Sequence, residues 1–319
     1  MARKSNKRGG ENAGKSETKS VKKTTKPESV KASAKKSTAK VADKKVVPKA
    51  VAPVATAPVK AVADKGNAFK KFFERKYEGK ENVDSLFGSP KLIAALVAEI
   101  LGSFVLVMAT LTTNASPLFV MFGALAAALL IYRISGAMIN PVITLGALVT
   151  RRISAIRAVF YIIAQVLGAM LAYIALKSFM GNTGAEEEMM MMGAPTLFSM
   201  APIPEGALWS VVAIEAIGAA LLAIFFARAI QSKKSPFTFG AIFAGGIFIA
   251  TIFAMSAAGY ISAGFALNPA LAVAMEAFTA VPEDFAVNAL AFIVAPIVGG
   301  IAGFVISDLM TRAAGVQEA

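Results

Sequence analysis

The sequence predicts an all-α membrane protein in which six transmembrane helices enclose two re-entrant half-helices, arranged as an inverted repeat. Three observations predict this fold class. Hydrophobic residues make up 56% of the chain and charged residues only 17%, a balance that soluble domains rarely show. Six apolar segments each approach the ~20 residues that a helix needs to cross a bilayer. The dipeptide Asn-Pro occurs in two similar apolar settings, at Asn140 and at Asn268.

The charged residues divide the chain near residue 90. Residues 1–90 hold 23 Lys and Arg against 9 Asp and Glu, so this segment carries the whole basic excess of a chain whose net charge is +13. Residues 1–66 contain no aromatic residue, and segments of this composition bury too little apolar surface to offset their conformational entropy. We therefore expect residues 1–90 to form a disordered basic tail and residues 91–319 to form one membrane domain.

The end of the tail predicts a short helix on the membrane surface at residues 68–77. Phe69, Phe72, Phe73 and Tyr77 recur at helical spacing, with Lys and Arg between them. Polybasic segments beside a membrane favour anionic lipid, so lipid contact is one hypothesis for the tail. A soluble linker is the simpler alternative, and binding to nucleic acid is the least favoured of the three.

The six expected spans alternate with short loops whose charges predict the orientation. The spans fall at about residues 92–112, 117–134, 156–178, 207–230, 237–258 and 285–307. Basic loop residues gather on the same side as the tail: Arg151, Arg152, Arg157, Arg228, Lys233, Lys234 and Arg312. Acidic residues, with Lys177, gather on the other side: Glu186, Glu187, Glu188, Glu205, Glu283 and Asp284. Because basic loops face the cytoplasm, both termini are predicted to be cytoplasmic, in a protein of the plasma membrane.

The two Asn-Pro segments remain after the spans are counted. The apolar runs Pro141–Thr150 and Pro269–Phe278 contain about ten residues each, which reach ~15 Å, or half of the hydrocarbon core. Asn is a favoured helix cap and Pro is favoured at the first helical position, so Asn140 and Asn268 predict helices that begin at membrane depth. Irregular backbone at that depth is tolerated only inside protein or beside a water-filled cavity. We therefore expect two half-helices that face each other across a pore.

Matched signatures divide the membrane domain into two repeats, at about residues 91–178 and 207–308. They are Glu99-x-x-Gly102 with Glu215-x-x-Gly218, and Gln165-x-x-Gly168 with Pro296-x-x-Gly299. Each repeat contains three spans, and because this number is odd the second repeat must be inverted. Inverted repeats with broken helices at their interface are typical of transport proteins.

Five stretches together resemble the aquaporin family, also called major intrinsic proteins, which includes the glycerol facilitators. In chain order they are AEILGSFVLV, ISGAMINPVITLG, YIIAQVLGA, AGFALNPALAV and APIVGG, and the resemblance covers about residues 91–310. It implies a right-handed bundle, usually a homotetramer with one pore in each subunit and no cofactor. It also implies passive flow of water or of small neutral solutes such as glycerol, urea or ammonia.

The resemblance assigns roles to the Asn-Pro motifs and to two intramembrane carboxylates. The motifs are Asn140-Pro141-Val142 and Asn268-Pro269-Ala270, where Val142 replaces the usual Ala. The two Asn side chains would donate N–H groups to the passing solute, and the positive ends of both half-helices would disfavour cations. Glu99 and Glu215 match residues that accept hydrogen bonds from the re-entrant loops, although an intramembrane carboxylate is also a candidate ion site.

The predicted selectivity filter departs from the family pattern. Leu271 stands where the family usually has Arg, and Phe265 lies in a GFALNPA stretch that resembles glycerol facilitators. Counting back from the second motif gives Ser256 where water-selective members usually have His. The second-helix position is either Val120 or Phe122. The resulting filter is apolar, uncharged and poor in hydrogen-bond donors.

The composition argues against several other functions. The chain contains no Cys and no His, so it lacks thiolate chemistry and the commonest general base, and an enzyme is not expected. The Met189–Met192 run has no His or Cys nearby, so we interpret it as a variable loop and expect no metal site. Two alternatives remain: a non-conducting membrane protein of the same fold, and a secondary transporter whose coupling-ion candidates would be Glu99 and Glu215.

We predict that removing residues 1–66 leaves the membrane domain folded, because this segment has no core of its own. A soluble fragment of residues 1–90 should bind anionic vesicles more tightly than a fragment of residues 67–90, and added salt should weaken that binding. Vesicle co-sedimentation measures both fragments. Equal binding of the 1–90 fragment to neutral and anionic vesicles would exclude the lipid role.

Overall fold

The computed structural model describes residues 90–181, 198–232, 235–278 and 284–314 of the 319 residues. Within these ranges the chain is helical and contains no strand. The predicted tail, the surface helix at residues 68–77 and the Met189–Met192 run lie outside the described residues.

Six spans are long and apolar enough to cross a membrane within the described part of the chain. They are α3 (Pro90–Thr112), α4 (Pro117–Ser135), α6 (Ala155–Gly181), α8 (Leu208–Gln231), α9 (Pro236–Tyr260), and a last span made of α11 (Phe285–Ala289), η2 (Leu290–Val294) and α12 (Ala295–Ala313). The π-helical stretch η2 precedes Pro296, which has no N–H to donate to the preceding turn. A wider turn at this point lets the span continue through the proline.

Two short helices begin at the Asn-Pro motifs: α5 (Pro141–Val149) and α10 (Pro269–Ala274). The predicted length of about ten residues is wrong for α10, which has only 6. The helix stops because Glu276 adopts a left-handed backbone with φ 58°. In addition, the carbonyl of Met275 accepts a hydrogen bond from Met200 N at 2.9 Å, which joins the end of α10 to the segment before α8.

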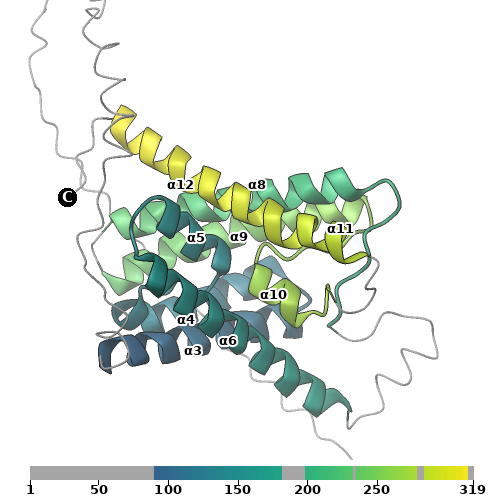
Figure 1. Ribbon diagram of the computed structural model, residues 1–319, viewed down its shortest axis with the longest axis horizontal. Coiled ribbons are helices and arrows are strands. Elements are labelled where there is room, and N and C mark those ends of the chain that lie inside the picture. The colour runs from purple at the N-terminus through teal and green to yellow at the C-terminus, as the bar shows by residue number, and fades with distance from the viewer. Residues whose placement is uncertain (1–89, 182–197, 233–234, 279–283, 315–319) are drawn as a thin grey trace, which may run out of the picture. The chain divides into compact units, whose positions relative to one another are not determined.

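The two repeats pack in the same manner. In the first repeat α3 contacts α4 and α6, and in the second α8 contacts α9 and α12. Each half-helix contacts the third span of the other repeat, α5 against α12 and α10 against α6. Figure 1 shows α8 and α12 side by side, with α5 and α10 between the two groups of spans. The structure is the predicted bundle of six spans and two half-helices.

Two matched glycines allow the closest approaches between spans. A Cβ atom built on Gly168 of α6 would collide with the backbone carbonyl of Ile100 on α3. A Cβ atom on Gly299 of α12 would collide in the same way with the carbonyl of Ala216 on α8. Small residues let helix backbones approach in membranes, where packing rather than the hydrophobic effect holds helices together.

The outer surface of the bundle is apolar, as a bilayer requires. Successive turns of α3 expose Ile93, Val97 and Leu101, with exposed fractions of 43–58%. Trp209 and Tyr260 are 71% and 91% exposed at the ends of their spans, where aromatic side chains contact the interface between lipid and water. The chain is an integral, multi-pass membrane protein.

We predict that Gly168→Ala and Gly299→Ala each lower the melting temperature of the detergent-solubilised protein. The added methyl meets backbone atoms that cannot rotate away, so the spans must separate, at about 1–3 kcal/mol. Gly245→Ala is the matched control, because nothing lies within 4 Å of a Cβ atom there. This control should be neutral or stabilising, by up to about 1 kcal/mol from helix propensity. Circular dichroism melts measure all three variants, and equal melting temperatures would contradict the close-contact role.

Candidate functional site

The site begins at the first residues of the two half-helices. Asn140 and Asn268 have extended backbones, with φ −155° and −154°, and each caps its own helix. Their Oδ1 atoms accept hydrogen bonds from Val142 N at 2.9 Å and from Ala270 N at 3.0 Å. This cap uses the side-chain oxygen, so the NH2 group of each amide is directed away from the helix.

The loops before the half-helices are held by the two buried carboxylates. Glu99 accepts hydrogen bonds from Met138 N at 3.1 Å and Ile139 N at 2.7 Å. Glu215 accepts in the same way from Ala266 N at 2.5 Å and Leu267 N at 2.8 Å. Both carboxylates are 0% exposed. In each loop they therefore satisfy two backbone N–H groups of buried residues.

The same loops contain matched strained residues directly before each Asn. Ile139 has φ 41° and Leu267 has φ 54°, a left-handed conformation that costs a non-glycine residue about 1–3 kcal/mol. This conformation turns the chain from the loop into the half-helix. The bonds from Glu99 and Glu215 to these residues hold the turn in place.

The two repeats differ around their carboxylates. Gln165 Nε2 donates to Glu99 Oε2 at 2.8 Å and to the Thr144 hydroxyl at 2.8 Å, which ties α6 and α5 to the first loop. Pro296 occupies the matched position in the second repeat, and a proline side chain has nothing to donate. The second carboxylate is therefore held by backbone N–H groups alone within the described residues.

A single hydrogen bond joins the two half-helix starts. Asn140 Nδ2 donates to the carbonyl oxygen of Leu267 at 3.0 Å, so one repeat touches the loop of the other at membrane depth. The Asn268 amide makes no corresponding bond to the described part of the chain. Its two N–H groups are thus available to a molecule beside it.

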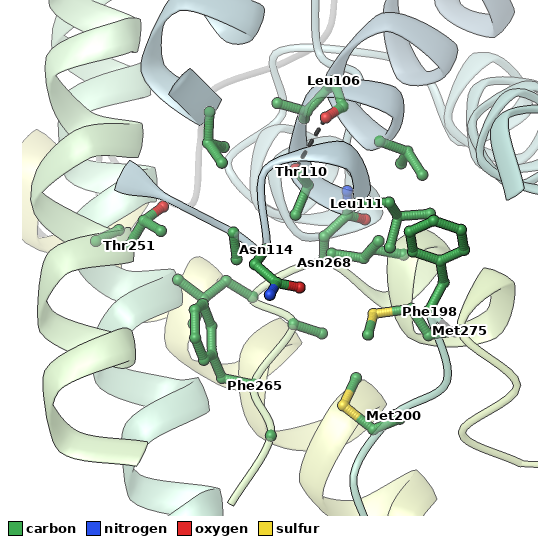
Figure 2. Close-up of a pocket in the computed structure, with 18 of the residues that line it drawn as sticks. Leu106, Thr110, Leu111, Asn114, Phe198, Met200, Thr251, Phe265, Asn268 and Met275 are labelled. Carbon is green, nitrogen blue, oxygen red and sulfur yellow. Dashed lines mark hydrogen bonds between the residues drawn. The ribbon is translucent and has the colours of Figure 1, made fainter. Parts of the chain in front are cut away.

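A cavity of about 430 Å³ reaches both Asn residues from one side of the bundle. Its walls come from the second half of α3, the start of α4, residues 198–201, the middle of α9 and residues 263–268. Figure 2 shows side chains from these elements turned toward a common space, with Phe198, Met200 and Met275 on one side and Thr251 and Phe265 on the other. The cavity thus lies on one side of the paired Asn residues.

Three of the predicted filter residues line this cavity: Val120, Phe265 and Leu271. Val120 is 5% exposed, whereas Phe122 is 52% exposed on the outside of the bundle. The two alternatives for the second-helix position are two residues apart, which is about 200° of helix rotation, so only one of them faces inward. The alternative Phe122 is therefore wrong.

The prediction for Ser256 also needs correction. Ser256 is exposed and does not line the cavity, and Ile252, one turn earlier on the same face of α9, is 40% exposed. The cavity is lined on α9 by Ile247, Ala250 and Thr251, and Thr251, which is 6% exposed, is the polar residue among them. Counting back from Asn268 fixed neither the depth along α9 nor the direction in which a side chain points, because Thr251 lies five residues before Ser256 and the connecting loop decides how the helix is placed.

The cavity also contains residues that the sequence analysis did not identify, including Thr110, Asn114 and Met200 as well as Thr251. The signal for Thr251 was weak: the buried small residues Ala250 and Ala254 lie near it, but small residues also surround Ser256. No comparable signal pointed to Asn114 or Met200, which belong to connecting segments.

The described cavity ends at Asn140, Leu222 and Ile247. One turn further along α8 and α9 lie Phe226 and Phe243, both 0% exposed, with ring centroids 5.2 Å apart and the rings edge to face. These rings belong to a larger aromatic cluster that adds Tyr132, Phe239 and Phe304. An aromatic cluster thus lies one turn beyond the described end of the cavity.

An ion pair holds the far end of α5. Arg152 Nη2 lies 2.5 Å from Asp308 Oδ1 on α12, and Asp308 is fully buried. The Arg152 guanidinium also lies 5.2 Å from the centre of the Phe304 ring and donates to the Thr150 hydroxyl at 2.6 Å. A cation at a helix C-terminus is favourable, and here it fixes the half-helix against the span that it contacts.

The Major intrinsic protein family model matches residues 86–306. The chain belongs to this family. This chain is similar in fold to the X-ray structure of the aquaglyceroporin from Plasmodium falciparum, with a TM-score of 0.52 and 18% identity. The alignment covers 70% of this chain and 97% of the aquaglyceroporin chain.

Curated relatives match parts of this major intrinsic protein. Aquaporin TIP4-2 of Zea mays is 30% identical over 190 residues, which span 58% of this chain and 66% of the relative. Probable aquaporin TIP-type alpha of Phaseolus vulgaris is 42% identical over 64 residues, or 20% of this chain and 24% of the relative. Glycerol uptake facilitator protein-like 6 of Lactiplantibacillus plantarum is 49% identical over 51 residues, which span 16% of this chain and 24% of the relative. Two of these alignments thus span about a quarter of the relative. The family is one of channels and not of enzymes.

Proposed function

We propose that the chain is a passive channel for water and small neutral solutes, with glycerol-like solutes, urea and ammonia among them. The observation that carries the proposal is the cavity of about 430 Å³ that reaches both Asn residues and is lined by Leu271. The names of the relatives support both water and glycerol as solutes. The geometry favours a filter of low polarity.

The paired half-helices supply the means to pass neutral solutes and exclude cations. Both helix N-termini point toward the same region, where Asn140 contacts the loop of the other repeat. A helix N-terminus carries about half of a positive elementary charge, so a cation or a proton is repelled here while a neutral solute is not. The available N–H groups of Asn268 donate to a solute oxygen, which replaces a bond that the solute made to water.

The wall near the filter favours a wide passage with few donors. Leu271 is 5% exposed and Phe265 is half-buried, and both offer only apolar surface to the cavity. An Arg at residue 271 would supply five N–H donors and a permanent charge that together narrow the passage. Without an Arg at this residue, solutes with apolar carbon atoms pay a smaller free-energy cost on entering the filter. Exclusion of cations then depends on the half-helices.

The proposal extends to the arrangement of the protein in the membrane. Arg133, Arg228 and Arg312 lie in the last turns of α4, α8 and α12, the ends that the topology assigns to the cytoplasm with both termini. Basic residues at these ends support a cytoplasmic orientation. We also infer a homotetramer in the plasma membrane and contact of the basic tail with anionic lipid, by analogy with the family and from the charge of residues 1–90.

A non-conducting protein of the same fold is the second candidate. The fully buried rings of Phe226 and Phe243 favour it, because they fill the space one turn beyond the cavity. A conducting channel requires these rings to move or the passage to pass beside them. Direct measurement of flux separates the two functions.

The proposed function predicts measurable flux in proteoliposomes. The wild type should accelerate osmotic shrinkage with water and re-swelling with glycerol or urea, in separate stopped-flow experiments. Asn268→Asp should lower each flux about tenfold or more, because a carboxylate has no N–H to donate and adds charge to the constriction. Asp284→Asn is a control at the outer mouth, away from the two Asn-Pro motifs. A wild type that conducts none of the solutes supports the non-conducting alternative.

A second prediction concerns the residue where the family usually has Arg. Leu271→Arg should narrow the solute range and lower the ratio of glycerol to water permeability by about tenfold, which corresponds to about 1.4 kcal/mol. Leu271→Met is the matched control, because it conserves volume and adds no donor. Gel filtration in detergent checks that each variant is folded. If the wild type conducts water alone and rejects glycerol, urea and ammonia, the donor-poor filter is wrong.

A further inference from the structure

Thr251 differs from every other threonine that the structure describes. A threonine in a helix commonly donates its hydroxyl to the carbonyl one turn earlier. Six described threonines do so, over donor–acceptor distances of 2.7–3.2 Å: Thr110, Thr112, Thr113, Thr144, Thr150 and Thr311. Thr238 instead bonds to Ser235, the cap of its helix. The Thr251 hydroxyl makes no hydrogen bond to any described residue.

Thr251 is a buried residue whose hydroxyl is directed into the cavity. Thr251 is 6% exposed, and it lines the cavity together with Ile247 and Ala250 of the same helix. Figure 2 shows it on the α9 wall, on the same side as Phe265 and facing the space that Asn268 also borders. The hydroxyl oxygen is accessible from the cavity, since it is not among the buried side-chain atoms that lack a hydrogen-bond partner. Its hydrogen bonds therefore go to whatever occupies the cavity.

The chemistry of Thr251 complements that of the Asn pair. The amide NH2 of Asn268 only donates, whereas a hydroxyl both donates and accepts. Val120, Phe265 and Leu271 offer neither. A molecule with an oxygen near Asn268 and a second hydroxyl directed at α9 would satisfy both protein groups at once, and a neutral polyol has this pattern.

We infer that Thr251 is a solute-binding and specificity-determining residue, at which a hydroxyl of a neutral polyol bonds while another oxygen of the same molecule accepts from Asn268. This inference rests on the proposed channel function and names the class of solute at the same site. It places a polar contact for the solute on α9, in a cavity where Leu271 supplies none.

The experiment compares Thr251→Val with Thr251→Ser in proteoliposomes that report water and glycerol permeability separately. Valine removes the hydroxyl and nearly preserves the shape, while serine retains the hydroxyl. Thr251→Val should lower the ratio of glycerol to water permeability about fivefold, the effect of one net hydrogen bond. Thr251→Ser should stay within about twofold of the wild type, because the same bond can form.

Thr110→Val is the matched comparison. Thr110 lines the same cavity, but its hydroxyl already donates to the Leu106 carbonyl at 2.8 Å. Its replacement should therefore change the permeability ratio less than Thr251→Val does. A melting temperature for each variant separates binding from folding, since removal of an unbonded hydroxyl should not lower stability. Thr251→Ala provides a second loss of the hydroxyl if the valine variant does not insert.

The possible results distinguish this inference from the channel function. Equal loss of water and glycerol flux in Thr251→Val, or an equal change of the ratio in Thr110→Val, overturns the role of Thr251 and leaves the channel function intact. A lower ratio in Thr251→Val that serine restores supports it. A wild type that conducts no glycerol overturns both this inference and the proposed conduction of polyols.

Discussion

The structure depends on how two carboxylates satisfy backbone N–H groups in the middle of a membrane domain. A loop at this depth has no water to bond to, and each unsatisfied group would cost several kcal/mol. Glu99 and Glu215 each accept from two successive N–H groups, and this stabilises the left-handed Ile139 and Leu267. The left-handed turns in turn direct Asn140 and Asn268 to cap their helices. Without these acceptors the half-helices would have no fixed beginning.

The two repeats match in the residues that hold the half-helices and differ in the hydrogen bonds and cavities beside them. The carboxylates, the left-handed residues and the Gly168 and Gly299 contacts all recur at matched positions. The Asn140 amide, however, is bonded to the Leu267 carbonyl, while the Asn268 amide is left for another molecule. An open cavity also lies on one side of the Asn pair, and an aromatic cluster lies on the other. A symmetric scaffold thus holds different chemistry on the two sides of the Asn pair.

Sequence reasoning succeeded where the signal was local. The spans, the beginnings of α5 and α10 and the match between repeats follow from apolar length, cap residues and spacing. It failed for the end of α10, because Glu276 and the bond between Met200 and Met275 terminate that helix through a contact with a distant segment. It also failed for Ser256 and Thr251. Both are small hydroxyl residues on one apolar helix, and spacing from Asn268 could not separate them.

The sequence by itself determined the family, the number of spans and the positions of the half-helix starts, because bilayer thickness and helix capping act on residues near each other in the chain. The rotation of each span was decided only by the tertiary structure. In a soluble helix a polar stripe marks the outer face, but α9 is apolar on all sides because lipid covers its outer face. Only packing against α4 and α8 turns Thr251 toward the cavity and Ser256 away from it.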